Sequence, residues 1–367
     1  MGSLMVFDQG VESDGVLSEV EGHAINLGGT AETLRPMDER AVLFLNVICA
    51  ERTEMTIGAH VWMNGRVVAE AEATVPVRAH ALHYGSSVFE GIRAYATPQG
   101  PAVFCLEQHV DRLFDSCRIF RMALPYAPDE ISKAIVDLIR RNGHNDCYIR
   151  PIVYRGAGSF NLDHRKSPLE MAIMTLEWGR YLGVEAIEQG VDVMVSSWRR
   201  MAPNTFAPMA KIGGQYVNSS FIAMEAADGG FVEGVALDVE GNISEGSGEN
   251  IFLTKEGVVY TPPFSSAILP GITRMAVMTL CRDLDYRVEE RVLPREFLYT
   301  AEEAFFTGTA AEITPIKSVD RVPVGKGSRG PITARLQDEF FGITGGRVPD
   351  RHGWLTHVQA GKQTVKT

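Results

Sequence analysis

The chain has 367 residues, of which 45% are apolar, and its 35 basic and 46 acidic side chains give a formal net charge of −11. This apolar fraction excludes an intrinsically disordered chain, and the length suggests about two domains. An acidic balance without a basic stripe argues against nucleic acid or a membrane surface as a partner. The longest apolar run, residues 41–49, is interrupted by Asn46 and is far shorter than the roughly 18 residues of a membrane span.

The negative charge is concentrated at the N-terminus, where residues 1–55 hold ten carboxylates against three arginines. We expect these residues to form an acidic N-terminal extension, with residues 1–54 either dispensable or the product of an upstream start assignment. Their acidity contradicts a signal or transit peptide, so the expected location is cytoplasmic. The five cysteines show no CxxC spacing, and we expect buried thiols without disulfide bonds.

The first regular segment after residue 55 is a predicted β-hairpin. Residues 60–63 and 66–68 flank Asn64-Gly65, a pair that is the strongest short-range hairpin signal. Two amphipathic helices and two strands follow, in the order 107–121, 128–141, 148–154 and 169–176. Together these segments predict a small α+β domain over residues 56–177.

Residues 178–190 contain several glycines and are predicted to form an interdomain loop. The alternation of Val191, Val193 and Val195 then predicts a strand that opens a larger domain over residues 191–345. Its other predicted elements are a helix at 219–227, a hairpin of 251–253 with 258–260, and a helix at 272–284. We expect residues 346–367 to be a C-terminal tail that is loose from residue 351 onward.

A glycine pattern near the C-terminus imitates a dinucleotide-binding motif. Gly325, Gly327 and Gly330 match GxGxxG, and Asp350 lies 20 residues further on. Only 37 residues remain after Gly330, so a second strand of a βαβ unit cannot follow. A surface turn before a helix at 332–341 is the better interpretation. The nine histidines have no metal-ligand spacing, and we expect no metal site.

Lys211 is the first candidate for chemistry, because it is the only charged residue between Arg200 and Glu225. Apolar surroundings favour the neutral form of an amine, which can then form a Schiff base with a carbonyl compound such as pyridoxal phosphate. Taken alone, the residue is also typical of a lysine whose stem is buried while its ammonium group reaches water.

Two further segments supply what the other ends of such a cofactor require. Glu245 lies among small residues that permit close backbone approach, and its carboxylate could hold a proton on a pyridine nitrogen. The alternative is a loop carboxylate in water. Residues 269–274 open a helix whose free amides suit a phosphate, although a plain loop-to-helix junction explains the same pattern.

Six motifs in order along the chain resemble the branched-chain amino acid aminotransferases, which are class IV, fold type IV pyridoxal phosphate enzymes. The motifs are residues 83–93, 148–151, 210–216, 243–250, 269–274 and 307–314, and the resemblance covers residues 61–345. It implies an α+β fold of two domains, a small α/β N-terminal domain and a larger, mixed, β-barrel-like C-terminal domain.

The resemblance also implies which residues bind pyridoxal phosphate. Lys211 would form the Schiff base and act as the catalytic residue that moves a proton between the substrate Cα and the cofactor. Glu245 would pair with the pyridine nitrogen and Tyr216 with the phenolic oxygen. Arg112 would bind the phosphate through both arms of its guanidinium. The rest of the implied set is Leu269 on the ring and Ile272, Thr273 and Thr309 around the phosphate.

For the substrate, the resemblance implies three groups of residues. The α-carboxylate would meet Tyr148, Thr309 and Ala310. The side-chain carboxylate of glutamate would meet Tyr84, Arg150 and Tyr181, while Phe89, Gly91 and Trp178 would form apolar walls, with a core position as the alternative for Trp178.

The loop of residues 156–162, with Phe160 and Leu162, would reach the pocket of a neighbouring subunit. It departs from the Gly-Met-Gly-Val type of bacterial relatives, which leaves the fine substrate preference open. Arg93 and Glu249 also lie in motifs, and we interpret them as structural residues.

The implied reaction is a ping-pong transfer of the amino group from L-leucine, L-isoleucine or L-valine to 2-oxoglutarate. The implied partners are amino acids, 2-oxo acids and further copies of the chain, in a dimer or a hexamer built from dimers. Alternatives with the same fold are a D-amino acid or (R)-amine transaminase and an aminodeoxychorismate lyase. A catalytically silent binding protein is the alternative that is not an enzyme.

Overall fold

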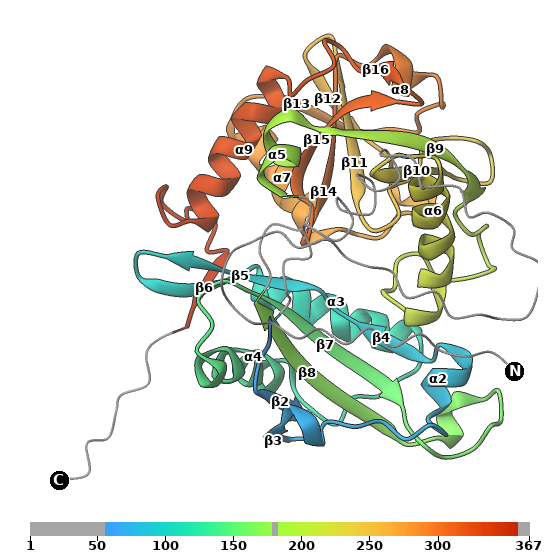
Figure 1. Ribbon diagram of the computed structural model, residues 1–367, viewed down its shortest axis with the longest axis vertical. Helices are drawn as coiled ribbons and strands as arrows, with labels where there is room; N and C mark the ends of the chain where they lie inside the picture. The colour runs from blue at the N-terminus through green and yellow to red at the C-terminus, as the bar shows by residue number, and fades with distance from the viewer. Residues whose placement is uncertain (1–55, 178–182, 359–367) are drawn as a thin grey trace, which may run out of the picture. The chain divides into compact units, whose positions relative to one another are not determined.

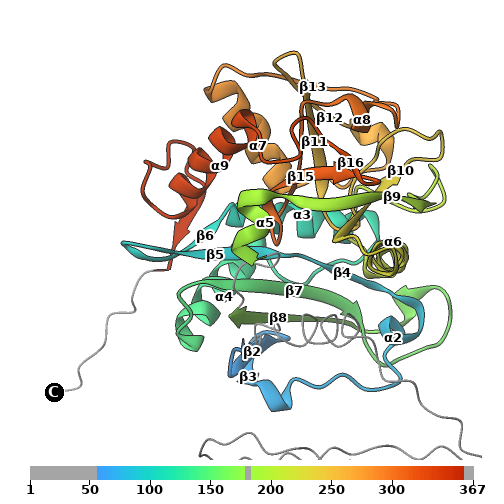
Figure 2. The ribbon, with the colours of Figure 1, turned by 45° about the horizontal axis from the view of Figure 1, so that its top comes forward.

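The computed structural model describes residues 56–177 and 183–358, which belong to one compact unit that contains two β-sheets (Figure 1). All strand pairs of the first sheet are antiparallel, and its central strands β7 and β8 lie side by side over their whole length (Figure 2). The strand order is β17-β6-β5-β7-β8-β2-β3, with β1 paired to β8 and β4 to β7. The strands are β1 (Thr56–Ile57), β2 (His60–Met63), β3 (Arg66–Ala69), β4 (Ser87–Phe89), β5 (Ile92–Thr97), β6 (Gly100–Phe104), β7 (Cys147–Arg155), β8 (Leu169–Glu177) and β17 (Leu355–His357).

Helices α3 (Leu106–Ile119) and α4 (Pro128–Asn142) pack together against this sheet. The apolar face of α3, with Val110 and Leu113, joins the face of α4 that carries Ile131 and Ile135 in one core. Pro128 occupies the first turn of α4, and Gly143 ends that helix in the left-handed conformation that favours glycine. A short helix, α2 (His80–Tyr84), precedes β4.

The second sheet is mixed, with parallel and antiparallel pairs, in the order β10-β9-β15-β14-β11-β12-β13 and with β16 paired to β15. Its strands are β9 (Val191–Arg199), β10 (Glu233–Leu237), β11 (Asn250–Lys255), β12 (Val258–Thr261), β13 (Arg287–Glu290), β14 (Glu303–Gly308), β15 (Glu312–Val319) and β16 (Val322–Pro323). Its helices are α5 (Gly183–Gln189), α6 (Tyr216–Asp228), α7 (Ile272–Asp283), α8 (Phe297–Thr300) and α9 (Pro331–Thr344).

The predicted helices and strands are present, with ends displaced by at most three residues. The glycine pattern is a turn, as expected: Gly325 and Gly327 have positive φ angles and α9 begins at Pro331. The first amides of α9 cannot serve a phosphate, because those of Ile332 and Thr333 donate to the Glu303 carboxylate. The four described cysteines are buried and free, and Cys49 lies outside the described residues. Over residues 56–177 and 183–358, no helix is both long and apolar enough to cross a membrane.

Two expectations for connecting segments are wrong. Residues 183–189 of the predicted loop 178–190 form helix α5, because Ile187 is buried and its carbonyl accepts a hydrogen bond from Gln337 Nε2 at 2.9 Å. The C-terminal tail is not loose over residues 351–358. There, β17 pairs with β6 of the first sheet, and Trp354 packs on Phe104 in the core. Residues 359–367 lie outside the described residues.

The docking of the C-terminal strand generates a stability prediction. Trp354 is only 4% exposed, so Trp354→Ala should lower the free energy of unfolding by about 3–5 kcal/mol, the usual cost of removing a buried aromatic side chain. Val322→Ala, at a position that is 44% exposed, should change it by less than about 0.5 kcal/mol. Urea titrations of both variants measure the difference, and equal effects would contradict the packed position of Trp354.

Candidate active site

Lys211 lies before α6, between the buried residues Ala210 and Ile212. Its backbone N–H donates to Ser116 Oγ on α3 at 3.0 Å, and its carbonyl accepts from the amide of Phe89 at 3.1 Å. The side-chain Nζ donates to Tyr216 Oη at 2.6 Å and lies 5.0 Å from the centre of the Phe89 ring. The backbone around Lys211 is therefore fixed by the first sheet and α3, and its amine is held against two aromatic side chains.

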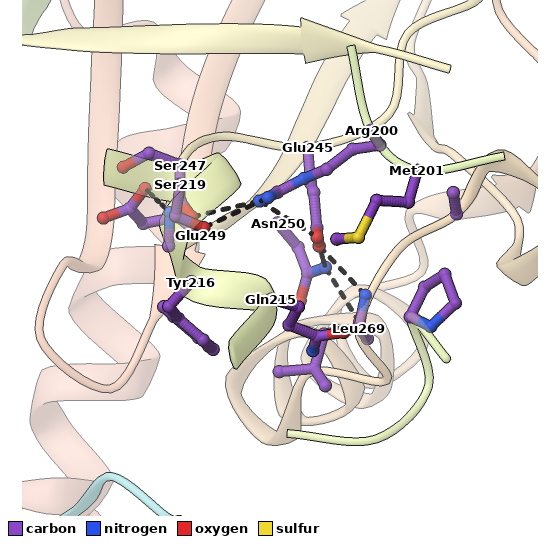
Figure 3. A pocket seen from close by; sticks show the side chains of 13 residues that line it. Arg200, Met201, Gln215, Tyr216, Ser219, Glu245, Ser247, Glu249, Asn250 and Leu269 are labelled. Carbon is purple, nitrogen blue, oxygen red and sulfur yellow. Dashed lines mark hydrogen bonds and ion pairs between the residues drawn. The ribbon is translucent and has the colours of Figure 1, made fainter. Parts of the chain in front are cut away.

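Glu245 is buried, and each of its carboxylate oxygens has a partner (Figure 3). Oε2 accepts from the Leu269 amide and from Asn250 Nδ2, both at 3.0 Å, and Oε1 lies 3.2 Å from Arg200 Nη2. Burial raises the pKa of the Glu245 carboxyl, while the Arg200 charge opposes that shift. The Glu245 carboxyl can thus form a hydrogen bond with a basic group placed against it, with the proton on either partner.

Arg112 forms the cationic end of the site. Its Nε and Nη2 donate to the two carboxylate oxygens of Glu90 at 2.7 and 2.8 Å, and its Nη1 donates to the Pro270 carbonyl at 2.7 Å. His109 contacts the same carboxylate at 2.8 Å. Although burial raises the pKa of Glu90, Arg112 and His109 hold that pKa well below its usual range. Glu90 therefore stays ionised and fixes the plane of the guanidinium.

The start of α7 lies beside Arg112, because Pro270 directly precedes the N-cap residue Gly271. The first amides of a helix have no acceptor within the helix, and its N-terminus carries a partial positive charge. Thr273 is buried in this first turn. Arg112 and the N-terminus of α7 together make a site for a phosphate group.

A cavity of about 500 Å³ joins these groups. The predicted cofactor-binding residues that line it are Arg112, Lys211, Tyr216, Leu269, Ile272, Thr273 and Thr309. The predicted substrate-binding residues that line it are Phe89, Gly91, Tyr148, Arg150 and Ala310. Glu245 lines a smaller adjoining cavity that shares Tyr216, Asn250 and Leu269 with the large one.

Arg150 and its neighbours form one wall of the large cavity. Arg150 Nη2 donates to Tyr148 Oη at 2.8 Å, and the guanidinium carbon lies 4.6 Å from the centre of the Phe89 ring. Gly91 leaves room for this arrangement, because a Cβ there would fall 2.2 Å from Tyr148 Oη. The Thr309 hydroxyl donates to the Gly91 carbonyl at 2.8 Å and so connects the wall to the second sheet.

Three predicted substrate-binding residues that the structure describes do not line this cavity. Tyr84, Phe160 and Leu162 are 46%, 53% and 78% exposed, and the Tyr84 hydroxyl donates to the Phe160 carbonyl at 3.4 Å. They form an exposed group outside the large cavity. Trp178 and Tyr181 lie outside the described residues. Arg93 pairs with Asp146 at 3.1 Å, as expected for a structural residue, whereas Glu249 lines both cavities.

Sequence reasoning missed the residues that hold the predicted ones in place. Glu90 lies in the motif of residues 83–93 and Asn250 in that of residues 243–250. Nothing in the spacing of these motifs identifies the side chains that the two residues contact. Arg200 had no sequence signal. Thr307 lines the large cavity, and its buried hydroxyl has no hydrogen-bond partner among the described residues.

These groups fit pyridoxal phosphate. The large cavity offers a cationic end for a phosphate and a primary amine, and the adjoining smaller cavity offers a buried carboxyl for a pyridine nitrogen. Buried polar atoms that lack partners in a folded protein indicate a place for a polar ligand, and Thr307 Oγ1 and Arg150 Nε are two such atoms of the described cavity wall.

Comparison with known proteins decides the family. The family described as amino-transferase class IV matches residues 87–319. This chain is a class IV aminotransferase. The branched-chain-amino-acid aminotransferase of Escherichia coli (strain K12) is 49% identical over 300 residues, which are 82% of this chain and 97% of that protein.

Solved structures of branched-chain amino acid aminotransferases agree with this assignment. The crystal structure of the E. coli branched-chain amino acid aminotransferase has a TM-score of 0.80 at 48% identity and covers 82% of this chain and 100% of its own. The T.th. branched-chain amino acid aminotransferase complexed with N-(5'-phosphopyridoxyl)-L-glutamate has a TM-score of 0.79 at 43% identity, over 83% and 100% of the two chains. The α+β fold and the pyridoxal phosphate cofactor expected from the sequence are thereby confirmed.

The geometry of Arg112 generates a binding prediction. Arg112→Lys keeps the charge but cannot bind Glu90 and Pro270 at the same time, so the affinity for pyridoxal phosphate should fall about 10- to 100-fold. Arg118→Lys, at an exposed position of the same helix, is the matched control and should leave the affinity unchanged. Absorbance titration of the cofactor-free variants measures both affinities. Equal affinities of the two variants would show that the orientation of Arg112 does not matter.

Proposed function

We propose that this class IV aminotransferase transfers the amino group of L-leucine, L-isoleucine or L-valine to 2-oxoglutarate, forming 2-oxo acids and L-glutamate. One observation carries the proposal: Arg150 lies on the ring of Phe89 in the same cavity as the amine of Lys211. The cavity thus presents an apolar surface and a guanidinium side by side. An apolar side chain can pack on the first, and a carboxylate can pair with the second.

When bound, pyridoxal phosphate supplies a carbonyl carbon for the amino group and a ring that takes up electron density. Arg112 and the amides at the start of α7 bind its phosphate. Glu245 holds the proton of the pyridine nitrogen, with its own orientation set by Asn250 and the Leu269 amide.

Lys211 acts as the acid and base that moves a proton at the substrate Cα. Its Nζ is confined by the hydrogen bond to Tyr216 Oη and by the Phe89 ring, so the amine returns to the same place after each transfer. Leu269 lines both cavities beside Tyr216, so its side chain would pack on the cofactor ring.

Arg150 and Tyr148 allow one pocket to accept two kinds of side chain. The hydrogen bond to Tyr148 and the contact with Phe89 hold the guanidinium flat along the wall while an apolar side chain is bound. Arg150 Nε has no partner among the described residues and can donate to a side-chain carboxylate. A buried donor without a partner makes binding of a carboxylate more favourable.

We further propose a homodimer in which the exposed group of Tyr84, Phe160 and Leu162 enters the partner's cavity. Large apolar side chains with this exposure are typical of a contact surface. The solvent-facing side of α6, with Phe221 stacked on Trp198, is a second exposed apolar surface. The choice between dimer and hexamer and the cytoplasmic location stay predictions.

The proposed function is tested by half-reactions of the purified holoenzyme. L-Leucine and L-glutamate should each convert the cofactor to its amino form, as measured by loss of the cofactor's visible absorbance, because the cavity offers both an apolar wall and Arg150. D-Alanine and (R)-1-phenylethylamine should not. A response to D-alanine alone would replace the proposal by a D-amino acid transaminase, and a Lys211→Ala variant that still turned over leucine would refute the role of Lys211.

The dual use of the pocket generates a prediction about Arg150. Arg150→Met should lower kcat/KM for 2-oxoglutarate by about 10- to 100-fold, because the side-chain carboxylate loses its charged partner. The value for L-leucine should stay within about threefold, since methionine keeps an apolar wall. Arg287→Met, at an exposed position of β13, serves as the control in steady-state assays. An equal loss for both substrates would contradict the selective role of Arg150.

A further inference from the structure

The carboxyls of Glu233, Glu245 and Glu249 lie at the loop of residues 245–249. Among the described residues, Arg200 is the one arginine that forms an ion pair with any of them. Arg200 Nη2 lies 3.2 Å from Glu245 Oε1 and donates to the carbonyls of Gly246 and Ser247 at 2.6 and 3.0 Å. Glu233 and Glu249 form no ion pair with any described residue. Figure 3 shows Glu245 on one side of the Arg200 guanidinium and Glu249 on the other.

Neighbouring groups of the same loop bind the two carboxyls that lack an ion pair. The Ser247 amide and hydroxyl donate to Glu233 at 3.2 and 2.9 Å, and the Gly248 amide donates to Glu249 Oε2 at 3.0 Å. Two consecutive residues, Ser247 and Gly248, therefore bind the two carboxyls. Two neighbouring carboxyls that have no ion pair of their own are disfavoured as two anions, which favours one proton between them.

We propose that Glu233 and Glu249 share one proton in the resting enzyme. Glu249, which faces the cavity, is then a positioning residue, because its neutral form leaves Arg200 paired with Glu245. This inference rests on the proposed cofactor site, in which Glu245 faces the pyridine nitrogen. It does not depend on which amino acid is the substrate.

The charged and titratable groups around Glu249 support the shared proton. Glu233 comes from β10, Arg200 follows β9, Glu245 lies on the same loop, and Tyr216 and Lys211 line the cavity from α6 and the segment before it. Burial and the Glu233 charge raise the pKa of Glu249 to about 8, and Arg200 opposes this only in part. Burial also raises the pKa of Glu233.

The proton shared by Glu233 and Glu249 affects the ion pair of Arg200 with Glu245. If both carboxyls were ionised, they would attract Arg200 as Glu245 does. Below the pKa of Glu249, the pair carries a single negative charge and Arg200 stays with Glu245. Above it, a second negative charge appears next to Arg200 and weakens its hold on Glu245. The carboxyl opposite the pyridine nitrogen then loses its fixed orientation, and catalysis falls on the alkaline side.

Infrared spectroscopy of the holoenzyme between pH 6 and pH 10 tests the proposal directly. The wild-type protein should show the carbonyl stretch of a protonated carboxyl that disappears with a midpoint near pH 8. Glu249→Gln should lack this transition, and Glu233→Gln should move it to lower pH because a neighbouring negative charge is gone. A band that persists unchanged in Glu249→Gln, or that is missing from the wild type at pH 6, would overturn the proposal.

A pH profile distinguishes positioning from a purely structural role. In the wild type, kcat/KM should fall about fivefold between pH 8 and pH 9, following one ionisation with a midpoint near pH 8. In Glu249→Gln this fall should be absent, because glutamine reproduces the neutral carboxyl, whereas Glu225→Gln should keep it. Glu225 is a matched control because it also accepts backbone and serine hydrogen bonds, from Ser197 and Ser196, outside both cavities. An unchanged alkaline fall in Glu249→Gln would refute the role.

The infrared experiment and the half-reactions with amino acids test the Glu233–Glu249 pair and the proposed function separately. If the shared proton is found but L-leucine fails to react, the amino acid specificity is wrong and the Glu233–Glu249 pair remains. If L-leucine reacts but the transition is absent in the wild type, the pair is wrong and the aminotransferase function remains.

Discussion

The contact of Arg112 with Glu90 and Pro270 is the constraint on which the site depends. It joins the end of β4, helix α3 and the start of α7 through one guanidinium. A buried ion pair of this kind contributes little net stability, since desolvation of both charges offsets their attraction. The ion pair instead fixes positions. It directs the positive N-terminus of α7 and the plane of the Arg112 guanidinium toward the same cavity. Without it, the two halves of the phosphate site would come from elements with no fixed relation.

Other contacts across the two sheets set the remaining walls in the same way. Ser116 and Phe89 hold the backbone of Lys211, and the Thr309 hydroxyl holds the carbonyl of Gly91. Arg112, Lys211, Glu245 and Gly91 are therefore each held by a residue of another segment of the chain. The charges are paired in a graded manner: Glu90 is fully matched by Arg112, Glu245 is partly matched by Arg200, and Glu249 has no cation of its own among the described residues. In the proposed function, this gradation separates an end that binds the phosphate from an end that holds a proton.

Long periodic segments could be predicted from the sequence, because an amphipathic helix such as α3 or a strand such as β7 is determined by its own pattern of burial. Strand β17 could not be predicted from the sequence. Its three residues, 355–357, form a strand only because they pair with the edge of β6. Lys211 and Glu245 were found from their unusual neighbours, and Arg112 only through a family motif. Arg200 was missed because its contacts with the loop at residue 246 come from a segment 46 residues away. The exposed group with Phe160 is a similar case, as its proposed role needs a second copy of the chain.

We propose that Lys211 presents its amine to the cofactor in the adjoining cavities that Arg112 and Glu245 line. Reduction of the reconstituted protein with borohydride, followed by peptide mapping, measures this directly, because it fixes bound pyridoxal phosphate on the lysine that carries it. We expect a phosphopyridoxyl group on the peptide that contains Lys211, at one group per chain. Labelling of a different lysine such as Lys317, or no label on a protein that binds the cofactor, would contradict it.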